Sequence, residues 1–124
     1  TEELIELCKV ASNYGGMYIS HMRNEDSKVM SALEELIRIS KEADIPAEIY
    51  HLKSSRKPNW KKIDDIIKRV EEVRGQGLKI TADIYTYNAS STGLTGVIPT
   101  WVQEGGHKAW IERMKDPNIR PRLL

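Results

Sequence analysis

GGMYISHMRNE (15–25), IPAEIYHLKSS (45–55) and TADIYTYNASSTGL (81–94) are the stretches that decide the fold. Each contains a short run rich in apolar, β-branched and aromatic residues, which is typical of a strand. The first two runs end in a histidine, and these histidines, His21 and His51, lie 30 residues apart. A separation of this many residues along the chain leaves room for one helix between consecutive strands. The sequence therefore predicts repeated strand–helix units.

Three segments outside these runs have the periodicity of amphipathic helices. Residues 2–13, 27–43 and 59–74 each carry apolar side chains three and four positions apart. The last of these helices is expected to begin at an Asn59 cap and to bury Trp60 in its apolar stripe. The resulting order is helix–strand repeated three times.

This alternation predicts an α/β fold with about three parallel strands, over residues 15–23, 46–53 and 78–87. A small doubly wound sheet and part of a (β/α)8 TIM-type barrel both fit that order. We expect residues 1–87 to form the βα units. Residues 88–124 begin with a stretch rich in Ser, Thr, Gly and Pro, so we expect a long loop and then a short helix there.

Composition limits the classes of function. The chain of 124 residues has 19 Lys+Arg against 18 Asp+Glu, which argues against nucleic-acid binding. No apolar run approaches the roughly 18 residues that span a membrane. Cys8 is the only cysteine, so no intrachain disulfide forms, and cytoplasmic is the default expectation. Because the chain starts within a helical pattern and ends just after a turn, we expect a piece of a longer protein.

Polar side chains gather where the predicted strands end, which is the edge that carries active sites in α/β folds. His21 and His51 would lie about 5 Å apart at the backbone if their strands are neighbours. Two imidazoles at that distance suit one metal centre, although a catalytic zinc usually takes three or more protein ligands. The alternative is a pair of structural or exposed histidines. His107 follows the loop and is expected at the surface.

Three further residue types near these ends carry possible chemistry. Lys53 is suited to binding a substrate carboxylate, and the alternative is a lysine exposed at the surface. Tyr85 and Tyr87 are suited to donating hydrogen bonds to a carboxylate or oxyanion, and the alternative is aromatic packing. Asp83 is suited to three roles: metal ligand, base, or a group that orients a neighbouring residue. No histidine is placed to make Ser91 a nucleophile, so serine hydrolysis is set aside.

The motifs quoted above, together with PTWVQEGG (99–106), resemble N-acyl-D-amino-acid deacylases of the metal-dependent amidohydrolase superfamily. The resemblance runs from about residue 2 to residue 122. It implies a (β/α)8 barrel, of which this chain supplies roughly the fifth to seventh strands. The family's H-x-H motif, its Cys or carboxylate ligand and its proton-transferring Asp are not among these residues. The middle proline of the family's Tyr-Pro-Tyr segment is Thr86 here.

The resemblance also implies roles for individual residues. His21 and His51 match metal ligands of the family, and the implied cofactor is zinc, as one or two ions in the whole enzyme. Lys53 and Tyr85 match residues that hold the substrate carboxylate or carbonyl, and Tyr85 is thereby the candidate catalytic residue. Ser91 matches a serine of the substrate pocket.

The implied reaction is hydrolysis of the amide bond of an N-acyl-D-amino acid to a D-amino acid and a carboxylate. We expect the isolated segment to be inactive, because half of the metal ligands lie elsewhere. A cyclic amidase of the dihydroorotase or hydantoinase kind is one alternative. A non-catalytic α/β module is another. Open sheet edges also predict self-association of an isolated segment.

Overall fold

A parallel three-stranded sheet organises the first part of the chain. Its strands are β1 (Tyr18–Ser20), β2 (Ala47–Ile49) and β3 (Ile80–Ala82), in the spatial order β1-β2-β3. Tyr18 pairs with Ala47, and Ala47 pairs with Ile80, so the three strands are in register. The predicted α/β class with three parallel strands is confirmed. The strands are shorter than the apolar runs predict.

The computed structural model describes residues 1–123. The chain separates into two units, Thr1–Thr86 and Tyr87–Leu124, and each is treated by itself. The first contains the sheet and the helices α1 (Glu2–Ser12), α2 (Val29–Ala43) and α3 (Lys62–Gly75). All three helices were expected near these positions.

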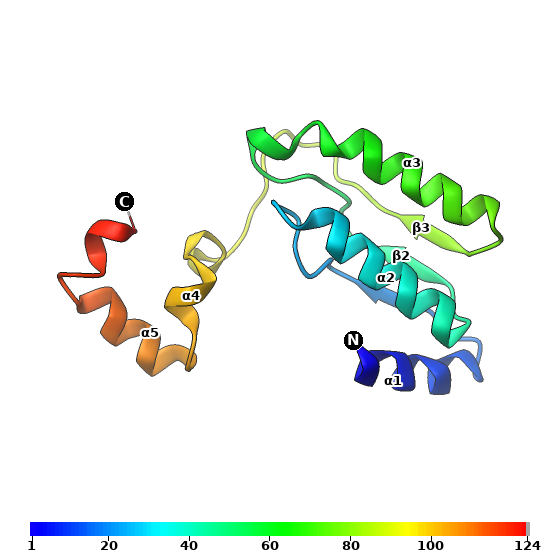
Figure 1. The fold of residues 1–124 in the computed structure, drawn as a ribbon, viewed down its shortest axis with the longest axis horizontal. Coiled ribbons are helices and arrows are strands. Elements are labelled where there is room, and N and C mark those ends of the chain that lie inside the picture. The colour runs from blue at the N-terminus through cyan, green and yellow to red at the C-terminus, as the bar shows by residue number, and fades with distance from the viewer. Residues whose placement is uncertain (124) are drawn as a thin grey trace. The chain divides into compact units, whose positions relative to one another are not determined.

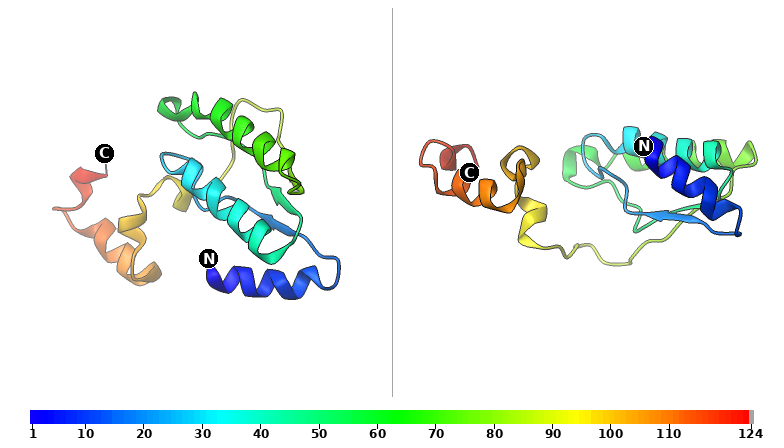
Figure 2. Two further views of the ribbon diagram at one scale, coloured as in Figure 1. Left: turned by 45° about the vertical axis from the view of Figure 1, so that its right-hand side comes forward. Right: turned by 90° about the horizontal axis from the view of Figure 1, so that it is seen from below.

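Helices α2 and α3 cover one face of the sheet, as Figures 1 and 2 show from different sides. Both helices are amphipathic, and their apolar stripes meet the buried side chains of the strands. Leu33, Ile49, Ile66 and Ile80 are each fully buried in this layer. The remaining buried members of the core are Met22, Val29, Ala32, Leu36, Ile37, Ala47, Val70 and Val73.

A smaller apolar cluster fixes α1 against α2. Ile5 and Cys8 of α1 are buried against Ile39, Ala43 and Ile45. Cys8 is therefore a free cysteine inside the core, as its place on the apolar helix face predicts.

The opposite face of the sheet is open within residues 1–86. Ile19 is 41% exposed there, and the Thr81 hydroxyl donates a hydrogen bond to the Glu48 carboxylate at 2.9 Å. Side chains alternate between the two faces of a strand. Ile19, Glu48 and Thr81 therefore point away from the helices, whereas the buried residues next to them in β2 and β3 point into the core. The sheet is consequently covered by helices on one side only in this unit.

The start of the third helix differs from the prediction. A 3₁₀ turn, Lys57–Asn59, precedes α3, and no side chain caps either segment. Asn59 is buried instead of capping, because its amide is used in contacts between two loops. Trp60 is 60% exposed rather than part of the buried stripe.

The second unit is helical. It contains 3₁₀ helices at Leu94–Val97 and Arg120–Arg122 and the helices α4 (Thr100–Gln103) and α5 (Gly106–Lys115). The short helix expected near residue 107 is therefore present as α5. The region predicted to be loop, however, holds the first 3₁₀ helix and α4, which are too short to give a periodic pattern. Among residues 1–123, no helix is both long enough and apolar enough to cross a lipid bilayer.

Candidate active site

The register of the sheet brings His21 and His51 together. Ser20, the last residue of β1, pairs with Ile49, the last residue of β2. His21 follows the first of these directly, and His51 follows the second after one residue. Parallel strands end at the same edge of a sheet, so both side chains reach that edge.

The two imidazoles converge through their nitrogens. Nδ1 of His21 contacts Nε2 of His51, the ring centroids lie 4.4 Å apart, and the ring planes are inclined by 44°. The ring of Tyr50 packs edge-on against His21 at 5.2 Å. The predicted juxtaposition of the two histidines is therefore present.

His51 is held by an unusual backbone conformation. Its φ is 39°, in the left-handed region that few side chains adopt without support. The carboxylate of Asp83 accepts the backbone N–H of His51, and the backbone carbonyl of Asp83 accepts the N–H of Leu52 at 2.9 Å. Asp83 thus orients a neighbour, which is one of the three roles that its position allows.

The carboxylate of Glu25, which strand alternation would place on the face of His21, joins the site. Oε1 of Glu25 lies 3.0 Å from Nδ1 of His51, and Oε2 lies 2.7 Å from Nζ of Lys53. All three side chains are largely buried, with exposed fractions of 21%, 27% and 26% for Glu25, His51 and Lys53.

Lys53 also approaches the histidine and the tyrosine. Its Nζ lies 2.6 Å from Nδ1 of His51 and 3.3 Å from the carbonyl oxygen of that residue. The ammonium stands 5.8 Å from the centre of the Tyr85 ring, and that ring is 6.3 Å from the His51 ring. His21, His51, Lys53 and Tyr85 therefore form one cluster, in which Lys53 is not a surface lysine.

Other candidates lie outside this cluster. Ser91 and Tyr87 are exposed and belong to the second unit, so the cluster is described without them. His107 is also exposed, at the start of α5, where its ring packs edge-on against Trp110 at 5.3 Å. The role of Ser91 remains a prediction.

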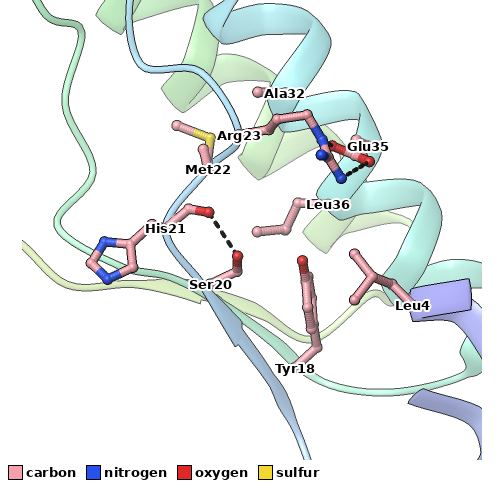
Figure 3. Close-up of a pocket in the computed structure, with 9 residues that line it drawn as sticks. All are labelled: Leu4, Tyr18, Ser20, His21, Met22, Arg23, Ala32, Glu35 and Leu36. Atoms are coloured by element: carbon pink, nitrogen blue, oxygen red, sulfur yellow. Dashed lines mark hydrogen bonds and ion pairs between the residues drawn. The ribbon is translucent and has the colours of Figure 1, made fainter. Parts of the chain in front are cut away.

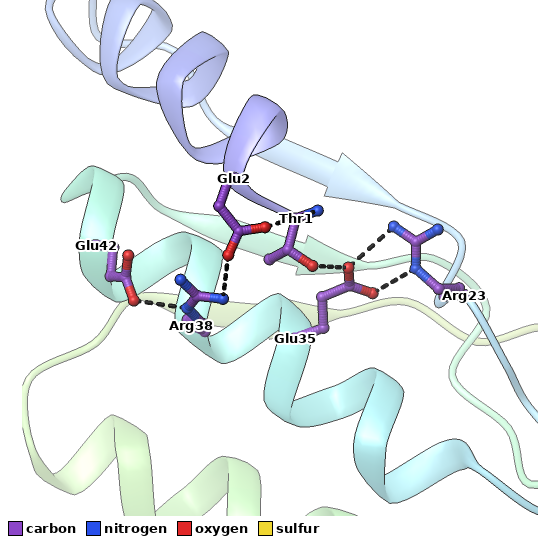
Figure 4. A network of polar contacts seen from close by, with 6 residues as sticks. All are labelled: Thr1, Glu2, Arg23, Glu35, Arg38 and Glu42. Atoms are coloured by element: carbon purple, nitrogen blue, oxygen red, sulfur yellow. Dashed lines mark hydrogen bonds and ion pairs between the residues drawn. The ribbon is translucent and has the colours of Figure 1, made fainter.

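Arg23 turns away from His21, although strand alternation predicts a shared face. The strand ends at Ser20, so the alternation stops before Arg23. Its guanidinium donates two hydrogen bonds to Glu35 of α2, at 2.7 and 2.9 Å (Figure 4). This guanidinium and the Thr1 hydroxyl lower the pKa of Glu35 to about 2. Arg23 thus connects the chain after β1 to α2.

A pocket of about 280 Å³ lies beside this ion pair, between the end of β1 and the helices (Figure 3). Its wall includes Leu4, Tyr18, Arg23 and Glu35. Of the cluster described above, only His21 also lines the pocket. The convergent nitrogens and the pocket are therefore different features of the molecule.

Asn59 ties together the loops that carry the cluster. Its amide nitrogen donates to the Asp26 carboxylate and, at 2.9 Å, to the Ser55 carbonyl. Its amide oxygen accepts from Nζ of Lys62 at 2.8 Å, and the same ammonium donates to the Ser27 carbonyl at 2.8 Å. The loop after β1 and the loop after β2 consequently share one buried polar connection.

The donor set fits a metal such as zinc. Imidazole nitrogens are common zinc ligands, and ligating histidines usually donate their other N–H to a carboxylate. His51 has a carboxylate near the nitrogen that does not face His21, since Oε1 of Glu25 lies 3.0 Å from Nδ1, and Lys53 is the hydrogen-bond partner of that nitrogen. Among the residues described, no group of three or more His, Cys, Asp or Glu side chains is placed to hold one ion. The two histidines by themselves would supply only part of a ligand set.

Comparison with known proteins gives a consistent set of relatives. No protein-family model matches the chain. A D-aminoacylase of Alcaligenes xylosoxydans xylosoxydans is 38% identical over 94 residues, which are 76% of this chain and 19% of that protein. An N-acyl-D-glutamate deacylase of the same organism is 31% identical over 90 residues, 73% of this chain and 18% of that protein.

Solved structures agree with the sequence matches. The crystal structure of a D-aminoacylase described as defining a novel subset of amidohydrolases matches with a TM-score of 0.66 and 35% identity. An N-acyl-D-glutamate deacylase from Bordetella bronchiseptica, complexed with zinc and a phosphonate inhibitor, matches with a TM-score of 0.67 and 30% identity. Each match covers 69% of this chain and 18% of the other.

Over the matched residues, the chain is thus similar in sequence and fold to part of an amidohydrolase. More particularly, it is similar there to a D-aminoacylase and to N-acyl-D-glutamate deacylases. The chain spans about a fifth of the length of these relatives. The D-aminoacylase of another solved structure has a binuclear metal centre. Metal binding is therefore a property of that relative.

Proposed function

We propose that this chain is a segment of a zinc-dependent hydrolase that cleaves the amide bond of N-acyl-D-amino acids. The observation that carries the proposal is the convergence of His21 Nδ1 and His51 Nε2 at the ends of neighbouring parallel strands. The homology to deacylases supports the substrate class. In this proposal, the three strands are part of a (β/α)8 barrel, with residues 1–87 forming the βα units and residues 88–124 an insertion after them.

His21 and His51 would hold the metal, using Nδ1 of the first and Nε2 of the second. A bound zinc ion lowers the pKa of its water to about 7 and polarises the amide carbonyl. Further ligands and the proton-transferring Asp would come from other parts of the enzyme. For that reason we propose that the segment has no activity by itself.

Lys53 is suited to bind the α-carboxylate of the substrate. An ammonium has three N–H donors, and the Glu25 carboxylate and the ring Nδ1 and carbonyl oxygen of His51 lie within their reach. The contact with the carbonyl oxygen is the longest, at 3.3 Å, and a substrate carboxylate would replace it. The nearby Tyr85 hydroxyl would donate to the carboxylate or to the oxygen that gains charge during hydrolysis, and Ser91 would line the substrate pocket.

The lone, buried Cys8 is compatible with a reducing compartment, and we propose a cytoplasmic location on that ground. Within residues 1–86, β1 and β3 each pair on one side only. We propose that an isolated segment would associate with other copies through these edges.

Kinetics of the purified full-length protein test the proposal. We expect hydrolysis of N-acetyl-D-amino acids, slower hydrolysis of their L enantiomers, and bound zinc that survives dialysis. His21→Ala and His51→Ala should each lower kcat/KM by at least about 100-fold and reduce the zinc content. Lys53→Met should raise KM about 10- to 100-fold, as expected for loss of a charge-assisted hydrogen bond.

Lys68→Met is the matched control, since Lys68 is exposed on α3. A protein that hydrolyses cyclic amides in preference to open-chain substrates would instead be a cyclic amidase. A protein that retains no zinc and hydrolyses neither substrate would be a non-catalytic module, and the proposal would be rejected.

A further inference from the structure

One carboxylate touches both the candidate metal ligand and the candidate substrate-binding residue. The two oxygens of Glu25 are divided between them, at 3.0 Å from His51 Nδ1 and 2.7 Å from Lys53 Nζ. Glu25 comes from the loop after β1, whereas His51 and Lys53 come from the chain after β2. The contact therefore joins two strand ends as well as two side chains.

We propose that Glu25 is the positioning residue that holds the imidazole of His51 and the ammonium of Lys53 together in one site. This inference rests on the proposed function, in which the first binds zinc and the second binds the substrate carboxylate. Glu25 itself touches neither ligand.

Glu25 approaches His51 from outside the histidine pair. Its Oε1 lies 3.0 Å from Nδ1 of His51, the nitrogen that does not face His21. A carboxylate beside the outer nitrogen orients an imidazole and makes it a better metal ligand.

The same carboxylate orders the lysine. The Nζ of Lys53 lies 2.6 Å from Nδ1 of His51 and 2.7 Å from Oε2 of Glu25. The charge-assisted contact with Glu25 holds the ammonium against the ring. Without a negative charge at this position, the ammonium would lose this anchor, and both sites would be disturbed.

Glu25 is held in place by its own loop. Its backbone carbonyl accepts the N–H of Ser55 at 2.6 Å, which ties it to the strand end that carries His51. The side-chain oxygen of Asn24 accepts the N–H groups of Asp26 and Lys28, each at 3.0 Å, and so closes the turn on either side of Glu25. A fixed backbone on both sides is what a positioning residue requires.

The inference predicts a combined defect that a purely structural residue would not produce. In the full-length protein, Glu25→Gln keeps the size of the side chain and removes its charge. We expect zinc affinity, measured by competition with a chromogenic chelator, to fall about 10- to 100-fold. We also expect KM for an N-acetyl-D-amino acid to rise several-fold, because Lys53 loses its anchor.

Two further variants isolate the cause. Glu25→Asp keeps the charge on a shorter side chain, so it should restore zinc affinity in part. Glu34→Gln is the matched control: this glutamate pairs with Arg69 between α2 and α3 and does not contact the cluster. Its zinc affinity and KM should equal those of the wild type.

The nitrogen NMR spectrum of the wild-type zinc protein provides a readout that is independent of turnover. We expect the side-chain nitrogen signals of His51 and Lys53 to differ from the wild type in Glu25→Gln and to match it in Glu34→Gln. If Glu25→Gln does not fold, Glu25→Asp makes the same comparison: shifted signals with a partial loss of zinc affinity support the inference, and wild-type values reject it.

Three results would overturn the inference. Zinc affinity and KM of folded Glu25→Gln within twofold of the wild type would reject it alone and leave the proposed function in place. Unchanged nitrogen signals of His51 and Lys53 in folded Glu25→Gln would do the same. A wild-type protein that binds no zinc would reject the proposed function and this inference together.

Discussion

The carboxylate of Asp83, which follows β3, accepts the backbone N–H of His51, which follows β2 and has a φ of 39°. Left-handed backbone is costly for a residue with a side chain, and it persists where surrounding contacts fix it. Asp83 provides such a contact from the neighbouring strand end. The orientation of a candidate metal ligand therefore depends on a residue 32 positions further along the chain.

Replacing Asp83 should loosen His51. We expect Asp83→Ala to lower the free energy of unfolding by about 1 kcal/mol, since one backbone hydrogen bond to a charged acceptor at an exposed site is lost. It should also lower kcat/KM roughly tenfold by misplacing the imidazole. Denaturant titration and steady-state kinetics measure the two effects. Asp83→Asn keeps an acceptor oxygen and should lie close to the wild type; an Asn variant as impaired as Ala would contradict this role.

Removing the buried amide of Asn59 should cost more stability. Asn59→Ala leaves the Asp26 carboxylate and the Ser55 carbonyl without their shared donor, so we expect a loss of about 2 kcal/mol. Urea denaturation followed by circular dichroism is the measurement. Asn118→Ala, at an exposed position in the second unit, is the control and should change stability by less than about 0.5 kcal/mol. Equal effects of the two substitutions would refute the role of Asn59.

The ion pair of Arg23 and Glu35 gives a pH-dependent contribution to stability. The pKa of Glu35 is lowered from 4.5 to about 2 in the folded state, so its stabilisation is present above pH 4.5. It is lost as the pH falls from about 4.5 towards 2, because the carboxylate becomes protonated. Arg23 is 65% exposed, and solvent screening reduces the contribution to about 1 kcal/mol.

Comparing Glu35→Gln with the wild type tests this contribution. The difference in unfolding free energy between the two proteins should be largest at neutral pH and should shrink below pH 4.5. A difference that stays constant down to pH 2 would show that the negative charge of Glu35 does not contribute to the free energy of unfolding.

The core between the sheet and the helices should be sensitive to truncation. Leu33 is 0% exposed, so Leu33→Ala should lower the free energy of unfolding by about 3 kcal/mol through lost burial and a cavity. Leu7 is 61% exposed on α1, and Leu7→Ala should have little effect. Thermal denaturation of the two variants makes the comparison, and similar melting temperatures would contradict the described packing.

The sequence allowed the sheet and the paired histidines to be predicted because both depend on regular spacing. Apolar runs and helical periodicity locate the strands and helices, and the spacing of 30 residues between His21 and His51 places both at one edge. Strand alternation would place Arg23 on the face of His21, and this is wrong because the strand ends at Ser20 and side chains no longer alternate after it.

The contacts of Glu25 and Asn59 could not be predicted in the same way. Both residues lie outside the regular strands and α-helices and reach partners 26 to 33 positions away, so no periodic pattern marks them. An acidic residue four positions after His21 was the available signal for Glu25. Asn59 has the residue type of a helix cap, but burial and a neighbouring carboxylate determine its role.

The connection through Asn59 has a consequence for protein engineering. Because Asp26, Ser55 and Lys62 all bond to one buried amide, the shape of either loop depends on the sequence of the other. Transplanting one loop from a relative with a different substrate preference would leave half of this connection unmatched. The two loops form a single exchangeable unit, and grafting experiments should move them together.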